Sequence, residues 1–446
     1  MNLWADFDNQ QSPVEETVRP KPRGRLTEQA MLSLLRSWLL QDYVPSYSRA
    51  LAAMRFYRRC YWIDAWGVNL RSNGQAQVQD YTDTPSSPTT KGRKKETVQP
   101  LLPPVLQPVA ALSALLAQES RAIALYGIAL TEGSSTRKEN KARLNKVHSN
   151  MEDGDNSTSD LNGTLNKLVL PKESGVVGAS WLEVGPALLQ EIDQSPAIFL
   201  LNPFGQALFR YENLAPLYQR TAPTELCLLL SHKQIEAQLI AASRSSANAS
   251  VLTSLLRTDR WKAFISKDVK TVDSESAVNG LLELLVASMQ KHFLTAQRIQ
   301  LPVQTGPAIL ESAPYGLLFA TRSKDSLACM NDAVCLYRRR LLRESYAGTL
   351  GEEWFLAQQQ ERDAEAREVM RQSVLQLGRK QRTRRWPDLR QQVLLANFGQ
   401  WTLHDYDVIM TSLLSEGAVR CEWKGRRSLD EGEGIRIPGN EDTLLW

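Results

Sequence analysis

The sequence has few residues of the types that build metal centres or disulfide frameworks. Among its 446 residues are five cysteines and four histidines. The cysteines contain no Cys-x-x-Cys pair, so neither a disulfide scaffold nor a zinc ribbon is expected. The histidines (His148, His232, His292 and His404) are far apart and none has metal-ligand spacing. We therefore expect each histidine to be structural or exposed, and no serine-histidine-acid set can be assembled.

A strong charge excess and a long apolar run are also missing. There are 53 basic and 49 acidic residues, a net charge of +4, which does not by itself indicate nucleic acid. No apolar run approaches the ~20 residues that span a bilayer. The polar start of the chain, residues 1–25, reads as a disordered leader without the apolar core of a signal peptide. These features predict a cytoplasmic protein without a membrane anchor.

The chain is organised around a strand, a turn and a second strand. Ala197–Leu201 is apolar throughout, which is typical of a strand covered on both faces, and Asn202–Gly205 ends it as a tight turn. A short amphipathic helix at Tyr211–Tyr218 precedes a second apolar run at Glu225–Leu230. This βαβ unit predicts an α/β, Rossmann-like sheet with helices on both faces, whose ligand crevice lies at the carboxyl ends of the strands.

Further elements fit this sheet. Tyr61–Ile63 is expected to be the first strand, with Asp64–Gly67 as its turn, and Ala122–Leu130 the second. Leu165–Leu170 is a short strand candidate. The sequence predicts two helices at Met31–Leu40 and Tyr47–Arg58. It also predicts an antiparallel edge pair at Gln297–Val303 and Tyr315–Thr321.

The domain organisation follows from shifts in composition. The Rossmann-like domain is predicted over residues 26–346, with polar, mobile inserts at about 71–99 and 133–160. A charged helical linker, 347–385, leads to a small domain at 386–446. There Trp386–Ala396 and Thr402–Leu414 read as helices, and Gly417–Trp423 and Gly434–Ile437 as the two strands of a wing. Helix, helix and wing in this order predict a winged-helix domain.

Several segments together resemble a known family. Asp64–Gly67 and Asn202–Gly205 each follow a strand, and the remaining segments are Thr258–Trp261, Tyr315–Arg322 and Met330–Asp332. In this order they resemble the three-Cys-motif partner (TcmP) proteins, bacterial proteins whose genes neighbour a radical-SAM-type protein with three cysteines. The resemblance implies a domain related to class I methyltransferases and a radical-SAM-type partner. This chain resembles a divergent member of the family.

The implied cofactor is S-adenosylmethionine, held at a turn after the first strand where the backbone approaches the ligand. Asp64 and Gly67 would form that turn, and the acidic Glu132 would hold the ribose hydroxyls. The family's Asp-Gly-Phe-Ala-Gly-Pro-Gly turn is shortened here to Asp64–Gly67, and Trp66 is bulky where small residues are wanted. Alternatively, Gly67 is a turn glycine and Glu132 an exposed loop charge.

Asn202 and Phe204 are the candidate catalytic residues. Asn202-Pro203-Phe204 resembles the Asn-Pro-Pro-aromatic turn of amino-directed methyltransferases, in which the amide accepts hydrogen bonds from the target amine and the aromatic ring stacks on a flipped base. The second proline is missing here, and the family's Asp-Pro-Phe-Gly turn has Asn202 in place of its Asp. A strand-ending Asn-Pro is also common turn chemistry, which is the competing interpretation.

The best candidate for nucleic-acid binding is a basic segment before the winged helix. Five of its seven residues are positive: Arg379, Lys380, Arg382, Arg384 and Arg385. Such a cluster would neutralise phosphates and give salt-dependent binding. Against this, the predicted recognition helix contains Asp405 and Asp407 and no lysine or arginine. The winged helix therefore has protein–protein packing as an alternative role.

Two functional hypotheses follow from these observations. In the first, the chain is a methyltransferase-related protein that uses S-adenosylmethionine and acts with a radical-SAM-type partner, with nucleic acid as a candidate substrate. In the second, it is a non-catalytic adaptor or nucleic-acid-binding protein that keeps the fold without the cofactor. The shortened first turn and Asn202 favour the second.

Overall fold

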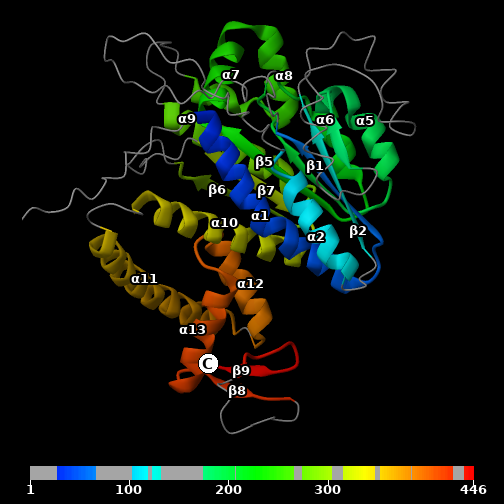
Figure 1. The fold of residues 1–446 in the computed structure, drawn as a ribbon. Helices are drawn as coiled ribbons and strands as arrows, with labels where there is room; N and C mark the ends of the chain where they lie inside the picture. The colour runs from blue at the N-terminus through cyan, green and yellow to red at the C-terminus, as the bar shows by residue number, and fades with distance from the viewer. Residues whose placement is uncertain are drawn as a thin grey trace, which may run out of the picture.

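The computed structural model describes residues 28–66, 103–118, 123–131, 174–205, 207–265, 274–303, 315–346, 352–382, 384–424 and 436–446. The predicted leader, both predicted inserts and the strand candidate Leu165–Leu170 lie outside these ranges. The described residues form a layered sheet domain and a smaller C-terminal module (Figure 1).

A seven-stranded sheet lies at the centre of the molecule. Its strand order is β3-β2-β1-β4-β5-β7-β6. β7 runs opposite to the other six strands and pairs antiparallel with both β5 and β6, and the remaining pairs are parallel. The strands are β1 (Arg59–Ala65), β2 (Ala124–Leu130), β3 (Gly175–Val177), β4 (Ala197–Leu201), β5 (Thr224–Ser231), β6 (Thr295–Leu301) and β7 (Tyr315–Thr321). The prediction of a mostly parallel sheet with an antiparallel pair at one edge is confirmed. β3 was not predicted, because three partly buried residues give too weak a signal.

Helices cover both faces of the sheet (Figure 1). One face packs against α1 (Glu28–Met54), α2 (Leu106–Gln118) and α10 (Lys324–Tyr346). The opposite face packs against α5 (Trp181–Ile192), α6 (Tyr211–Gln219), α7 (His232–Arg244), α8 (Ser246–Leu256) and α9 (Ser274–Met289). Every residue of β4 and β5 is buried, which explains why Ala197–Leu201 and, within β5, Leu226–Leu230 are continuous apolar runs in the sequence.

The prediction of two separate helices near the start of the described chain is wrong. A single helix, α1, runs from Glu28 to Met54 with Pro45 inside it. Proline removes one helical hydrogen bond and normally ends or kinks a helix. Here Tyr43, Val44 and Tyr47 flank Pro45 and are all buried, in the same core as α10. Packing of this turn offsets the lost hydrogen bond.

The C-terminal module comprises α11 (Glu352–Gln381), α12 (Trp386–Ala396), α13 (Leu403–Ser415), β8 (Arg420–Glu422) and β9 (Thr443–Leu445). β8 and β9 form an antiparallel pair, and the Leu444 amide donates to the Arg384 carbonyl at 2.7 Å. The segment between α11 and α12 therefore lies along β9. The described part of the module thus has three helices followed by an antiparallel strand pair.

The predicted second wing strand, Gly434–Ile437, is wrong at Arg436 and Ile437, while Gly434 and Ile435 lie outside the described residues. Arg436 and Ile437 belong to no strand, and β9 takes the place opposite β8. The cause is Asp442, whose carboxylate accepts hydrogen bonds from the Lys424 and Gly439 amides and from the Arg436 side chain. These bonds fold 436–442 into a loop, so the chain reaches the ladder only afterwards.

Candidate functional site

The order of the strands reverses between β1 and β4, and the carboxyl ends of these strands are the expected ligand crevice. Asp64 and Trp66 lie at the end of β1, and Asn202 follows β4. Of the three predicted cofactor residues, the structure describes only Asp64; Gly67 and Glu132 lie outside the described residues. The predicted cofactor set therefore stays a prediction, since only one of its members lies in the described part of the chain.

The side chain of Trp66 fills space at this switch point. Its indole Nε1 donates to the carbonyl oxygen of Cys227 at 3.1 Å. Cys227 belongs to β5, and β4 lies between β5 and β1, so the indole reaches across β4. Only 2% of Trp66 is exposed. A bulky, immobilised ring thus lies where the resemblance implies a small residue beside the cofactor.

Arg36 on α1 contacts both the backbone and the ring of Trp66. Its guanidinium donates to the Trp66 carbonyl at 2.8 Å and lies 5.4 Å from the centre of the indole ring. Arg36 itself is only 6% exposed. A buried arginine that pairs with a backbone carbonyl and an aromatic face fixes both in one geometry.

Asp64 is a buried acid that faces the same arginine. Its Oδ1 accepts a hydrogen bond from the Trp66 amide at 3.2 Å, while Oδ2 has no hydrogen-bond partner in the described part of the chain. Burial raises the pKa of Asp64, and the positive charge of Arg36 opposes that rise. Burial likewise lowers the pKa of Arg36, and Asp64 opposes this. The two charges therefore stabilise each other inside the fold, and neither faces solvent.

The turn after β4 does not support both predicted catalytic roles. Asn202 accepts from the Phe204 amide at 3.2 Å through Oδ1 and donates to the Gln234 side chain at 3.1 Å. Phe204 is fully buried in the core beneath α5–α9. The prediction that Phe204 stacks on a flipped base is wrong for this conformation, because its ring contacts core side chains. Asn202 forms an ordinary Asx turn, which was the competing interpretation.

A second buried acid lies near the amino end of β5, on the side of the sheet away from the carboxyl ends of β1 and β4. Glu225, near the amino end of β5, accepts a hydrogen bond from the Tyr47 hydroxyl at 2.6 Å. Burial raises the pKa of Glu225 to about 7, against the opposing effects of the Thr321, Tyr47 and Ser326 hydroxyls. The sequence did contain a signal for this group, since an acidic residue inside an otherwise apolar strand needs partners.

Two of the motifs that carry the family resemblance have structural roles here. Trp261 is buried, and its indole donates to the Thr253 hydroxyl at 2.9 Å, which fixes the turn after α8. Arg322, at the end of β7, donates to the carbonyls of Tyr218, Arg220 and His292. Both side chains join neighbouring loops, so neither is free to contact a ligand.

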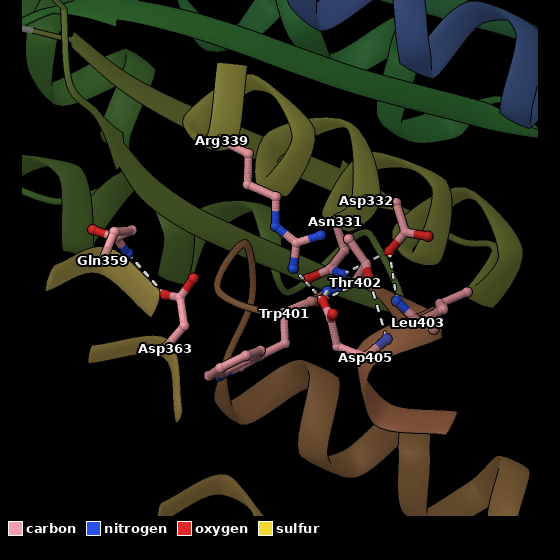
Figure 2. Close-up of polar contacts among 9 residues, drawn as sticks. All are labelled: Asn331, Asp332, Arg339, Gln359, Asp363, Trp401, Thr402, Leu403 and Asp405. Carbon is pink, nitrogen blue, oxygen red and sulfur yellow. Dashed lines mark hydrogen bonds and ion pairs between the residues drawn. The ribbon is translucent and has the colours of Figure 1, made fainter. Parts of the chain in front are cut away.

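The third motif, Met330–Asp332, fastens the C-terminal module to α10 (Figure 2). Asn331 is fully buried; it donates to the Trp401 carbonyl at 2.7 Å and accepts from the Gly399 amide at 2.8 Å. Asp332 accepts from the Leu403 amide at 2.9 Å. Gly399 has φ +74°, and a Cβ atom there would lie 2.1 Å from the Ile299 side chain. The turn between α12 and α13 thus fits closely against β6 and α10.

The acidic residues of α13 are satisfied within the protein. Asp405 accepts from the Thr402 amide and hydroxyl and pairs with Arg339 of α10 (Figure 2). Asp407 accepts from the Trp386 indole at 2.8 Å and pairs with Arg390 at 2.7 Å. Each carboxylate is neutralised by an arginine. The expectation that their charges would keep this helix from a phosphate backbone is therefore weakened.

The basic segment, by contrast, is open to solvent. All five of its cationic residues are exposed, and within the described ranges none of them forms an ion pair with a carboxylate. The backbone is nevertheless fixed at the end of the segment, where the Arg384 carbonyl accepts from β9, and Trp386, which follows the segment, is bonded to α13. The structure therefore presents a positively charged stretch on a rigid support.

Searches against known proteins returned no match. No family model, no curated protein and no solved structure is similar to this chain. Among the described residues, no helix is long and apolar enough to cross a membrane. No group of three or more histidine, cysteine, aspartate or glutamate side chains in these ranges could hold a metal ion. The function must therefore be argued from the two regions just described.

Proposed function

We propose that this chain is a non-catalytic, nucleic-acid-binding adaptor built on a methyltransferase-related sheet. The observation that carries the proposal is the Trp66 side chain, which lies across β4 at the switch point and is bonded to β5. A cofactor there would have to displace a buried indole and the arginine packed on it. Rearranging such packed side chains costs several kcal/mol, roughly what burial of an aromatic side chain contributes.

The relation to methyltransferases is supported by the sheet. A strand order of 3-2-1-4-5-7-6 with an antiparallel seventh strand is the arrangement of class I methyltransferases, and this chain has that order. The family resemblance adds a radical-SAM-type partner, which stays a prediction. Co-expression with such a protein, followed by co-purification, tests it, and failure to form a complex would count against the family assignment.

The nucleic-acid part of the proposal rests on the basic segment. Exposed cations without carboxylate partners attract phosphates and release counterions when they bind them. The test compares two double variants. The first combines Arg379→Gln and Arg384→Gln in the basic segment, and the matched control combines Arg362→Gln and Arg367→Gln on α11. Both changes remove two exposed charges. We expect only the first to weaken binding to a labelled oligonucleotide and to reduce its salt dependence.

The cofactor part is tested by calorimetric titration with S-adenosylmethionine. A folded sample that releases no saturable heat is the expected result. Saturable binding that is lost in Glu132→Ala or Gly67→Trp would instead support the second candidate, a methyltransferase-like enzyme. The observation that favours this candidate is the strand order, together with an acidic residue, Asp64, at the end of β1.

A further inference from the structure

One side of α13 is exposed and carries no charged side chain. His404, Val408 and Ser415 are exposed, with Val408 at 48%, and Thr411 is partly exposed. Since successive helical residues turn by about 100°, positions 404, 408, 411 and 415 lie along one strip. We call these four residues the α13 strip. The residues on the other side of the helix (Tyr406, Ile409, Met410 and Leu413) are buried in the module.

The strip is bordered by acids that the protein has already neutralised. On one side Asp407 pairs with Arg390, and on the other Asp405 pairs with Arg339 of α10. The side-chain types on the strip suit contact with base edges, because the His404 imidazole can form hydrogen bonds and the Val408 methyls can contact the methyl group of thymine. The Thr411 and Ser415 hydroxyls donate to the Asp407 and Ser412 carbonyls, so toward a base they act as acceptors. Nothing on the strip would repel phosphate.

The basic segment lies beside this strip. Arg384 accepts from Leu444 of β9, and Trp386, two residues later, donates to Asp407 on the edge of α13. The segment is therefore held between β9 and α13. The Trp386–Asp407 bond brings the chain directly after Arg384 and Arg385 to the edge of the strip, and the positive charge of these residues favours a polyanion as the molecule that covers it.

We propose that the α13 strip enters the major groove of double-stranded DNA while the basic segment contacts the adjacent phosphates. This inference rests on the proposed function and adds the form of nucleic acid and the surface that reads it. A helix fits the wide major groove of B-form DNA, whereas the major groove of double-stranded RNA is too deep and narrow to be read by side chains. Single strands are bound by stacking of successive bases on several exposed aromatic rings, and the strip has no phenylalanine, tyrosine or tryptophan.

The test is fluorescence anisotropy of the full chain with a labelled DNA duplex of about three helical turns, with either strand alone, and with the matching RNA duplex. Val408→Glu places a carboxylate in the strip without changing the core. Val369→Glu is the matched control, because Val369 is a 71% exposed valine on α11. We expect Val408→Glu to weaken duplex DNA binding about tenfold or more and Val369→Glu to leave it unchanged, since like charge at an interface costs more than 1 kcal/mol.

The outcomes separate this inference from the proposed function. If Arg379→Gln with Arg384→Gln weakens binding but Val408→Glu does not, the basic segment binds nucleic acid and the α13 strip does not read it. Equal affinity for single-stranded DNA or for RNA duplex also overturns the inference and leaves the proposed function in place. Absence of binding to any of the three nucleic acids overturns both.

Discussion

The carboxyl ends of β1 and β4 and the basic segment of the C-terminal module both carry charged residues, but the protein uses these charges differently. At the switch point Arg36 and Asp64 are buried together, and Arg36 bonds and covers the Trp66 turn. In the basic segment the cations are exposed and have no carboxylate partner among the described residues. In the first region the polar groups interact with other buried groups of the protein. In the second region the cations are exposed and can bind an anion.

This difference bears on where a ligand can bind. Burying a charge is costly unless another charge or dipole offsets the cost, and the positive charge of Arg36 offsets part of the cost of burying Asp64. Such a pair serves the folded structure and is not exposed to a ligand. An exposed arginine on a fixed backbone costs the fold little and gains its interaction only when an anion arrives. The predictions below, from the largest expected effect to the smallest, test whether the two regions differ in this way.

Trp66→Ala should destabilise the protein most, by about 3–5 kcal/mol, because it leaves a cavity across β4 and removes the hydrogen bond to the Cys227 carbonyl. Denaturant unfolding measures the loss. Trp66→Phe is the control that keeps most of the volume and removes the indole N–H, so its effect should be smaller. Affinity for DNA should not change in the folded protein. An unchanged free energy of unfolding in Trp66→Ala would mean that the indole does not contribute to the core.

Glu225→Gln should change how stability depends on pH. The pKa of Glu225 is raised in the folded protein to about 7, so the folded state holds this proton to higher pH than the unfolded chain does. The wild-type free energy of unfolding should therefore fall as pH rises from about 4.5 to about 7, by up to about 3 kcal/mol from this group.

Glutamine keeps an oxygen that can accept from Tyr47 but does not titrate. The difference in unfolding free energy between Glu225→Gln and the wild type should therefore grow in favour of the variant across this pH range. Parallel stability curves for the two proteins, measured by urea unfolding at several pH values, would show that Glu225 does not titrate there.

Asn331→Ala should weaken attachment of the C-terminal module by about 2–3 kcal/mol, since it leaves the buried Gly399 amide and Trp401 carbonyl without partners. Unfolding followed by tryptophan fluorescence measures the loss. Asp332→Asn retains an oxygen for the Leu403 amide and should cost less. If the variants rank in the opposite order, Asp332 and not Asn331 is the main attachment of the module.

Thr402→Ala should have the smallest effect, about 1 kcal/mol, because it removes the N-cap hydroxyl that accepts from the Asp405 amide. Thr402→Ser retains the cap and is the control. The thermal midpoint of unfolding reports the change. Asp405 keeps Arg339 as its partner in Thr402→Ala, so DNA affinity should be retained in the folded protein; a large loss would mean that the cap orients the α13 strip.

Much of the fold could be predicted because its signals are local. Ala197–Leu201 and Tyr315–Thr321 are apolar runs that match β4 and β7 residue for residue. The predicted α12 coincides with the observed Trp386–Ala396, and α13 begins after the predicted boundary residue Thr402. Strand β9 and the continuous α1 depend on contacts with distant residues, through Asp442 and through the core around Pro45, and no local pattern contains them.

The candidate site was harder to predict. Sequence identified Asp64, Asn202 and the basic segment as polar groups in informative places. It could not show that Phe204 points into the core, or that Arg36, thirty positions before Trp66, covers the same turn. It also counted the acidity of Asp405 and Asp407 against groove entry, and it could not show that each has an arginine partner.

The sequence by itself determined the α/β class, the central strands, the helices of the C-terminal module and the position of five clustered cations. These depend on apolar periodicity and composition, which are properties of neighbouring residues. The tertiary structure decided which charged side chains are buried with partners inside the fold and which are exposed to solvent. That distinction depends on burial and on partners far away in the chain, because the cost of a charge is set by its surroundings and not by its neighbours in sequence.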